Sequence, residues 1–228
     1  MVGIIILTFL SIAFAVACIT LRGKNKSFEG MICKFMASFS FIGVAILGNY
    51  LNGNSAVGYF SLVCFALLFG FCGDVFLGIK EIAPLFKKKL IPIGTGYFLI
   101  GHIIYLISFF TIGAKPLTAL FFPAGAVIAI ILMKIFKVDL GKAFTVILCV
   151  YYGLLIWKAG VGAELVITDF SVSNLLILIA SLLFIVSDTC LAFIYFTPVK
   201  KKNALVMVEL STYYPAQLLF ALSIYAMR

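Results

Sequence analysis

The sequence has 228 residues, of which 64% are hydrophobic and only 11% charged, and its mean hydropathy is +1.25. Soluble domains carry about a quarter charged residues, so these values exclude a soluble protein. The charges form short clusters between apolar runs of about 20 residues, which are long enough to cross a bilayer as helices. Membrane β-strands would alternate apolar and polar positions instead. We therefore predict an all-α, polytopic membrane protein.

Taken in chain order, the apolar runs predict eight transmembrane helices in one transmembrane domain over residues 1–228. The spans are Val2–Leu21, Met31–Gly48, Ala56–Ile79, Leu90–Gly113, Pro116–Met133, Leu140–Gly162, Ser171–Phe196 and Ala204–Met227. Each run is long enough to cross a bilayer as a helix.

Basic residues alternate between the connections. The first, third, fifth and seventh connections hold thirteen basic residues, against three in the other connections and at the C-terminus (Lys115, Lys158 and Arg228). By the positive-inside rule the basic loops are cytoplasmic and both termini lie outside. The net charge of +9 then reflects membrane orientation and attraction to anionic headgroups, so we expect membrane lipids, and not nucleic acid, as partners.

An internal repeat relates residues 1–114 to residues 115–228. Gly73–Gly78 matches Ser187–Ala192 as a small-Asp-x-x-Leu-small pattern, and Gly101–Ser108 matches Ala216–Ser223 in residue class. Four spans separate the copies, which is an even number. The repeat therefore predicts two parallel four-helix halves related by an axis along the membrane normal.

Asp74 and Asp188 are the aspartates that lie deep in predicted spans. Each precedes a proline by ten residues, about 15 Å of helix, which places both near mid-membrane. A charge there costs at least about 2.5 kcal/mol on insertion scales, so a functional role is favoured over neutral acids that only join helices. His102 and Gln217 reach a similar depth, and we expect one shared polar cavity.

Further polar residues share helix faces with these groups. His102 and Tyr105 are three apart, as are Tyr214 and Gln217, so each pair can point into that cavity; hydrogen bonding between helices is the alternative. His102 is the single histidine, which excludes a three-histidine zinc site. We expect no metal or cofactor, and a metal held by two carboxylates and one histidine is the alternative.

Lys34, at the start of the second span, offers a charge for a phosphate or carboxylate, unless it snorkels to the interface. Glu209 shares a face with Tyr213 and Gln217, or pairs with interfacial lysines. The six cysteines form no C-x-x-C pair, so neither a disulfide framework nor a thiolate metal site is indicated. No G-x-S-x-G, H-E-x-x-H or phosphate-loop motif occurs, so serine-hydrolase and nucleotide-driven chemistry are not supported.

Four short motifs in this order resemble the YhhN-type lysoplasmalogenase family. They are Gly73-Asp74 with Leu77, Gly101-His102 with Tyr105, Ser187-Asp188 with Leu191-Ala192, and Tyr214 with Ala216-Gln217. Members of that family are membrane hydrolases that cleave the vinyl ether bond of lysoplasmalogens to a fatty aldehyde and a glycerophospho-base. The resemblance implies the same lysophospholipid substrate here, eight spans, and catalytic roles for Asp74 and Asp188.

The resemblance also extends to substrate-binding residues. It implies that role for Lys34, His102, Tyr105, Tyr214 and Gln217. Lys34 resembles a second-span lysine of the family, although Phe35-Met36 stands where a proline is expected.

Vinyl ether hydrolysis needs a proton donor and a carboxylate together. Two close aspartates in a low-dielectric site cannot both ionise cheaply, so one would keep its proton and act as the acid. The other would stabilise the oxocarbenium ion and orient water. The alternatives are a small transporter, coupled to protons or carrying a lipid-like solute, and a non-catalytic lipid-binding or assembly protein. A lysine-rich, isoleucine- and phenylalanine-rich composition favours a bacterial cytoplasmic membrane.

Overall fold

The computed structural model describes residues 2–24, 26–138, 141–197 and 202–227. Within them, eight helices are long and apolar enough to cross a membrane, which confirms the predicted all-α polytopic fold. The helices are α1 (Val2–Gly23), α2 (Ser27–Leu51), α3 (Val57–Ile82), α4 (Lys87–Phe110), α5 (Phe121–Ile135), α6 (Gly141–Thr168), α7 (Val172–Phe196) and α8 (Lys202–Ala226). Each predicted span overlaps one of them.

Three spans differ most from the prediction at their starts. α2 begins at Ser27 and not at Met31. α4 begins at Lys87 and not at Leu90, so basic residues predicted as loop form its first turn. The fifth span opens with a 3₁₀ helix, η2 (Pro116–Leu120), before α5. Proline suits this first position because its missing N–H would be unpaired there anyway.

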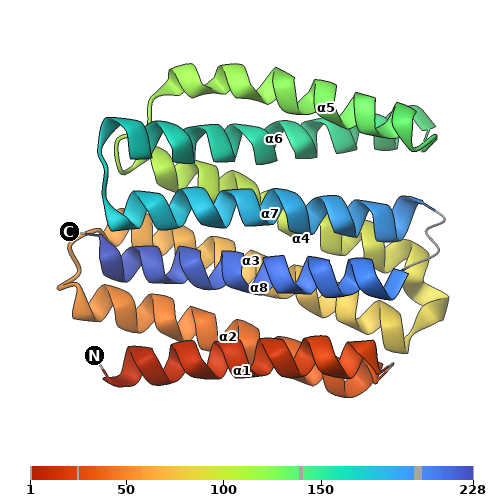
Figure 1. Cartoon of the computed structure of the whole chain (residues 1–228), viewed down its shortest axis with the longest axis horizontal. Coiled ribbons are helices and arrows are strands. Elements are labelled where there is room, and N and C mark those ends of the chain that lie inside the picture. The colour runs from red at the N-terminus through yellow and green to blue at the C-terminus, as the bar shows by residue number, and fades with distance from the viewer. Residues whose placement is uncertain (1, 25, 139–140, 198–201, 228) are drawn as a thin grey trace.

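Consecutive helices pack as antiparallel hairpins. The most extensive contacts join α7 with α8, α3 with α4, α1 with α2, and α5 with α6. Between the halves, α2 packs against α8 and α4 packs against α6, while α1 and α5 lie at opposite edges of the bundle (Figure 1). The repeat relates α2 to α6 and α8 to α4. It therefore predicts that a contact between α2 and α8 is matched by one between α6 and α4.

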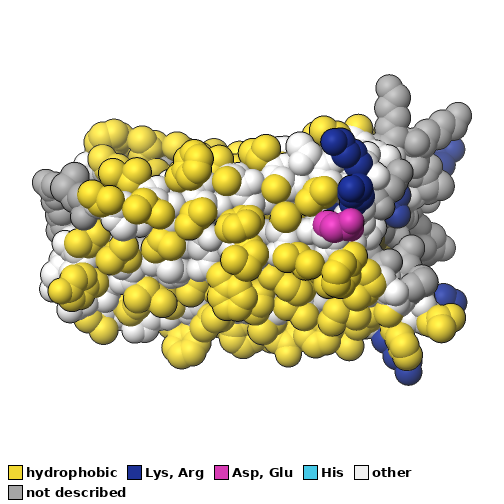
Figure 2. Space-filling model, turned by 90° about the horizontal axis from the view of Figure 1, so that it is seen from below, with side chains coloured by type: hydrophobic (Ala, Val, Ile, Leu, Met, Phe, Trp, Pro, Cys, Tyr) yellow, Lys and Arg dark blue, Asp and Glu magenta, His cyan; other side chains and the backbone are white. Residues whose placement is uncertain are grey.

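The C-terminal ends of α1, α3, α5 and α7 lie at one end of the bundle, opposite the start of α1 and the end of α8 (Figure 1). Figure 2 shows hydrophobic side chains along the length of one face and Lys and Arg gathered at that end. Which end faces the cytoplasm remains a prediction. Several residues on which the predictions rest lie outside the described residues. They are Leu140 at the predicted start of the sixth span, Pro198 ten residues after Asp188, and the basic residues Lys200, Lys201 and Arg228.

The interior combines aromatic packing with buried polar groups. Tyr59, Phe41 and Phe109 are almost fully buried, as is Asp74. Gly73 lets α3 approach α4 beside Asp74, because an added Cβ would lie 2.7 Å from the ring of Phe98. Small residues allow this close approach in membrane bundles, where packing and interhelical hydrogen bonds hold helices together.

Candidate active site

Asp74 of α3 is completely buried and is held by two other helices. From α2, the Lys34 ammonium lies 2.9 Å from Oδ1, and the Ser38 hydroxyl donates to Oδ2 at 3.2 Å. From α8, the Tyr213 hydroxyl donates to Oδ2 at 2.7 Å. Lys34 and Ser38 are four residues apart, so they occupy one face of α2. Lys34 is 5% exposed and paired with a carboxylate, so of the two alternatives for Lys34 the structure favours a charge for a carboxylate over snorkelling to the interface.

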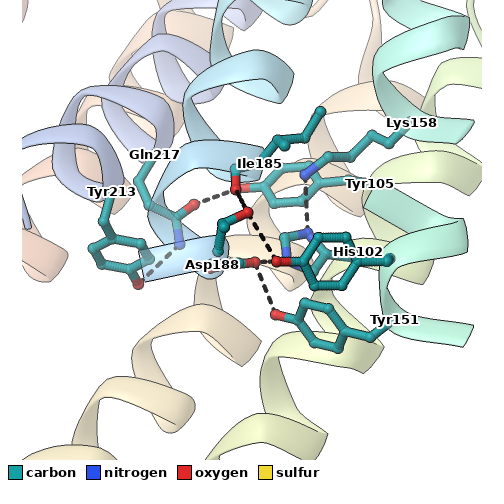
Figure 3. Close-up of polar contacts among 10 residues, drawn as sticks. His102, Tyr105, Tyr151, Lys158, Ile185, Asp188, Tyr213 and Gln217 are labelled. Atoms are coloured by element: carbon teal, nitrogen blue, oxygen red, sulfur yellow. Dashed lines mark hydrogen bonds and ion pairs between the residues drawn. The ribbon is translucent and has the colours of Figure 1, made fainter. Parts of the chain in front are cut away.

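Asp188 of α7 has an equivalent environment built from α4 and α6. The His102 Nε2 lies 2.9 Å from Oδ2, and the Tyr151 hydroxyl donates to the same oxygen at 2.9 Å. On the other side of the imidazole, the Lys158 Nζ lies 2.9 Å from Nδ1. Figure 3 shows Lys158, His102 and Asp188 in a continuous row. Each aspartate therefore has its own nitrogen base and its own tyrosine.

A chain of hydrogen bonds leads from the Asp74 cluster toward the Asp188 cluster. The Gln217 amide donates to the Tyr213 hydroxyl at 3.0 Å, and the Tyr105 hydroxyl donates to the Gln217 carbonyl at 2.7 Å. The Lys158 ammonium then lies 5.4 Å from the centroid of the Tyr105 ring. Buried hydrogen-bond networks rigidify a core where the groups in them find partners.

Most of the predicted site residues meet in this network. It contains Lys34, Asp74, His102, Tyr105, Asp188 and Gln217. Within the described part of the chain, no hydrogen bond joins Asp74 to Asp188 directly. The hydrogen bonds that start at Asp74 end at Tyr105, and only a cation–π contact of 5.4 Å leads on to Lys158 of the Asp188 cluster. The expectation that the two aspartates share one cavity and one proton is therefore wrong, because Asp188 lines a cavity that Asp74 does not line.

Tyr214 and Glu209 lie apart from the network. The Tyr214 hydroxyl donates to the Cys18 sulfur of α1 at 3.2 Å. Glu209 is buried, 8% exposed, and faces a cavity that Lys34 also lines. All six cysteines are free.

Sequence reasoning missed Lys158, Tyr151, Tyr213 and Ser38 as parts of the site. It counted Lys158 among loop residues, but this lysine is completely buried inside α6. The available signal was the depth of Lys158 in an apolar run, because an unpaired charge at that depth is costly. Removing it from the loop count strengthens the charge asymmetry from thirteen against three to thirteen against two.

Two cavities adjoin the site at the basic end of the bundle. The apolar cavity, about 270 Å³, lies between α4, α6 and α7, and Asp188 is the charged side chain among the described residues that line it. The polar cavity, about 370 Å³, is lined by Lys34, Lys80, Glu209 and residues of α1, α7 and α8. Leu191 and Tyr195 line both cavities, and Lys80 donates to the Tyr195 hydroxyl. The site thus borders both the apolar cavity and the polar cavity.

No group of three His, Cys, Asp or Glu side chains that could hold a metal occurs among the described residues. The YhhN family model matches residues 30–224. This match covers most of the chain and every residue of the two aspartate clusters, so the chain belongs to the YhhN family. No solved structure matches the chain.

Proposed function

We propose that this YhhN-family chain is a membrane hydrolase that cleaves the vinyl ether bond of lysoplasmalogens, releasing a fatty aldehyde and a glycerophospho-base. The observation that carries the proposal is Asp188 on the wall of the apolar cavity. Both hydrogen bonds that Asp188 accepts from described residues end on Oδ2. Its Oδ1 is then the oxygen that meets a ligand in the cavity.

Vinyl ethers hydrolyse after a proton reaches the double-bond carbon farther from the ether oxygen. The Asp188 carboxyl would deliver that proton, and its carboxylate would then stabilise the adjacent oxocarbenium ion. Water adds to the cation, its proton returns to Asp188, and the resulting hemiacetal collapses to the aldehyde and the alcohol. Exclusion of bulk water by the apolar walls strengthens each electrostatic contribution.

The two cavities fit the two ends of a lysophospholipid. The apolar cavity suits the single alkenyl chain, while the polar cavity offers the side chains of Arg22, Lys34, Lys80 and Lys202 to a phosphate. Because Leu191 and Tyr195 line both, one molecule lying across them would place its ether linkage near Asp188. Under the predicted topology, the headgroup would lie at the cytoplasmic face of a bacterial cell membrane.

Asp74 would contribute to the same reaction indirectly, through Lys34 at the polar cavity. Its ion pair at 2.9 Å fixes the Lys34 ammonium, a cavity-lining group. Its bond from Tyr213 continues to Gln217 and Tyr105. In this proposal Asp74 positions Lys34 for the headgroup, and Asp188 carries the proton transfer.

The proposal is tested with purified protein in detergent, which removes the two compartments that transport requires. A lysoplasmalogen and its saturated ether analogue are supplied, and free aldehyde is measured. We expect aldehyde from the vinyl ether alone. Absence of aldehyde, together with uptake of the lipid or of protons by sealed proteoliposomes, would instead support a transporter.

Gly96 offers a test of where the chain binds. It lines the apolar cavity, and an added Cβ there would have no neighbour within 4 Å. Gly96→Phe should place a ring in the cavity and lower kcat/KM for a long-chain lysoplasmalogen by about tenfold or more, with a smaller loss for a short-chain one. Gly58→Phe is the matched control, because Gly58 in α3 also has free space but lies outside the cavity. Equal losses in both variants would contradict this placement.

A further inference from the structure

Lys158 is completely buried in the centre of the bundle. Its Nζ lies 4.2 Å from the centroid of Phe184, 5.3 Å from that of Phe220 and 5.4 Å from that of Tyr105. Aromatic faces attract an ammonium ion, most strongly when water is excluded. The three rings around Lys158 therefore offset part of the cost of burying its charge.

The charge on Lys158 is balanced through His102. An ammonium group only donates hydrogen bonds, so with Lys158 charged the His102 Nδ1, which lies 2.9 Å from Nζ, accepts from it. The proton of the neutral imidazole then resides on Nε2, which donates to Asp188 Oδ2 at 2.9 Å. The row thus consists of a cation, a neutral imidazole in a fixed tautomer, and a carboxylate.

We propose that Lys158 is a positioning residue that stores the proton used at Asp188. The inference rests on the proposed function and assigns its acid a proton source. Lys158 passes one proton to His102 Nδ1 while His102 Nε2 passes another to Asp188. The ammonium becomes an amine, the imidazole changes tautomer, and the carboxylate becomes a carboxylic acid. When water attacks the oxocarbenium ion, its proton returns along the same row and restores the ammonium.

No other route of this kind leads to Asp188 from the described residues. Tyr151 contacts Asp188 as a donor from α6, but a phenol that lost its proton there would leave a buried anion. The titratable groups that face the row are Tyr105 from α4 and Tyr151 and Tyr152 from α6. Lys158 is the cation of the row, and it becomes a neutral amine when it releases a proton.

Two substitutions separate proton storage from structure. Lys158→Met removes both the donor and the proton, whereas Lys158→Arg keeps a charged donor that does not give up its proton. We expect both variants to lose about 100-fold in kcat at neutral pH, with KM changed less than about twofold. In Lys158→Met the proton must come from solvent, so kcat should rise about tenfold for each unit of falling pH, while the wild type stays nearly flat.

His102 is the single histidine of the chain, so ¹⁵N-histidine NMR reports this residue alone. We expect an unprotonated Nδ1 and a protonated Nε2 in the wild type and in Lys158→Arg, and loss of that preference in Lys158→Met. Lys134→Met, at an exposed lysine of α5, is the control for general effects of charge removal.

Three results would overturn the inference. A protonated Nδ1 in the wild type would show the opposite tautomer, and full activity in Lys158→Arg would show that charge alone suffices. A loss in Lys158→Met that is uniform at every pH would indicate a structural role. If the wild type released no aldehyde at all, the proposed function would be rejected instead. The stored proton would then have no reaction to supply.

Discussion

Replacement of Asp188 by asparagine is expected to lower aldehyde release from a lysoplasmalogen by about 1,000-fold or more. The amide keeps the shape of the side chain and can still accept a hydrogen bond at the position of Oδ2, where His102 and Tyr151 now donate. It cannot take up or deliver a proton, and general acid–base groups contribute about 100- to 10,000-fold to rates. The measurement is kcat in detergent, with thermal unfolding followed in parallel.

Asp169→Asn provides the matched control. Asp169 is exposed before α7, and its backbone carbonyl, which accepts from the Asn174 side chain at 2.7 Å, is unchanged by the substitution. This variant should retain wild-type turnover. Turnover near the wild-type level in a folded Asp188→Asn protein would remove Asp188 from the mechanism and favour a lipid-binding or transport role.

The helices were predictable because a bilayer imposes a simple length requirement. Backbone groups cannot remain unpaired in hydrocarbon, so each crossing needs about 20 apolar residues in one helix. Val172–Phe196 shows this well, since its predicted and observed ends differ by a single residue at the start. The starts of α4 and α5 were less predictable, because helical turns can continue into polar residues outside the hydrocarbon core.

The aspartates, His102 and Gln217 were predictable because each is polar where an apolar residue is expected, and because the repeat pairs them. Their partners were harder to identify. Tyr213 and Tyr214 lie four and three residues before Gln217, and both spacings place residues on one helix face. Only the packing against α3 and α1 shows that Tyr213 reaches Asp74 while Tyr214 reaches Cys18.

The pairing of the buried charged groups also could not be predicted from the sequence. Lys158 and His102 are 56 residues apart, and His102 and Asp188 are 86 apart. A lysine or tyrosine inside a span predicts that a partner exists, because unpaired polar groups in the membrane are costly. It does not identify the partner, which depends on how α4, α6 and α7 are arranged.

The second large effect is expected at the ion pair between Lys34 and Asp74. Both side chains are buried, with Nζ 2.9 Å from Oδ1. Removing one partner leaves an uncompensated buried charge, so Lys34→Met and Asp74→Asn should each lower the free energy of unfolding by about 3–5 kcal/mol. The double variant Lys34→Met/Asp74→Asn should be more stable than either single variant, because its amide can still accept from Ser38 and Tyr213 while no charge is stranded.

Chemical unfolding in detergent of the wild type, the two single variants and the double variant measures this coupling. Lys134→Met and Asp169→Asn, two exposed and separate positions, form a control cycle that should be additive within about 0.5 kcal/mol. Additive losses at Lys34 and Asp74 would contradict a stabilising charge pair. Because the double variant restores stability without restoring the ammonium at the polar cavity, its KM for a lysoplasmalogen should stay raised, which separates the role of Asp74 in folding from its role in holding Lys34 for the substrate.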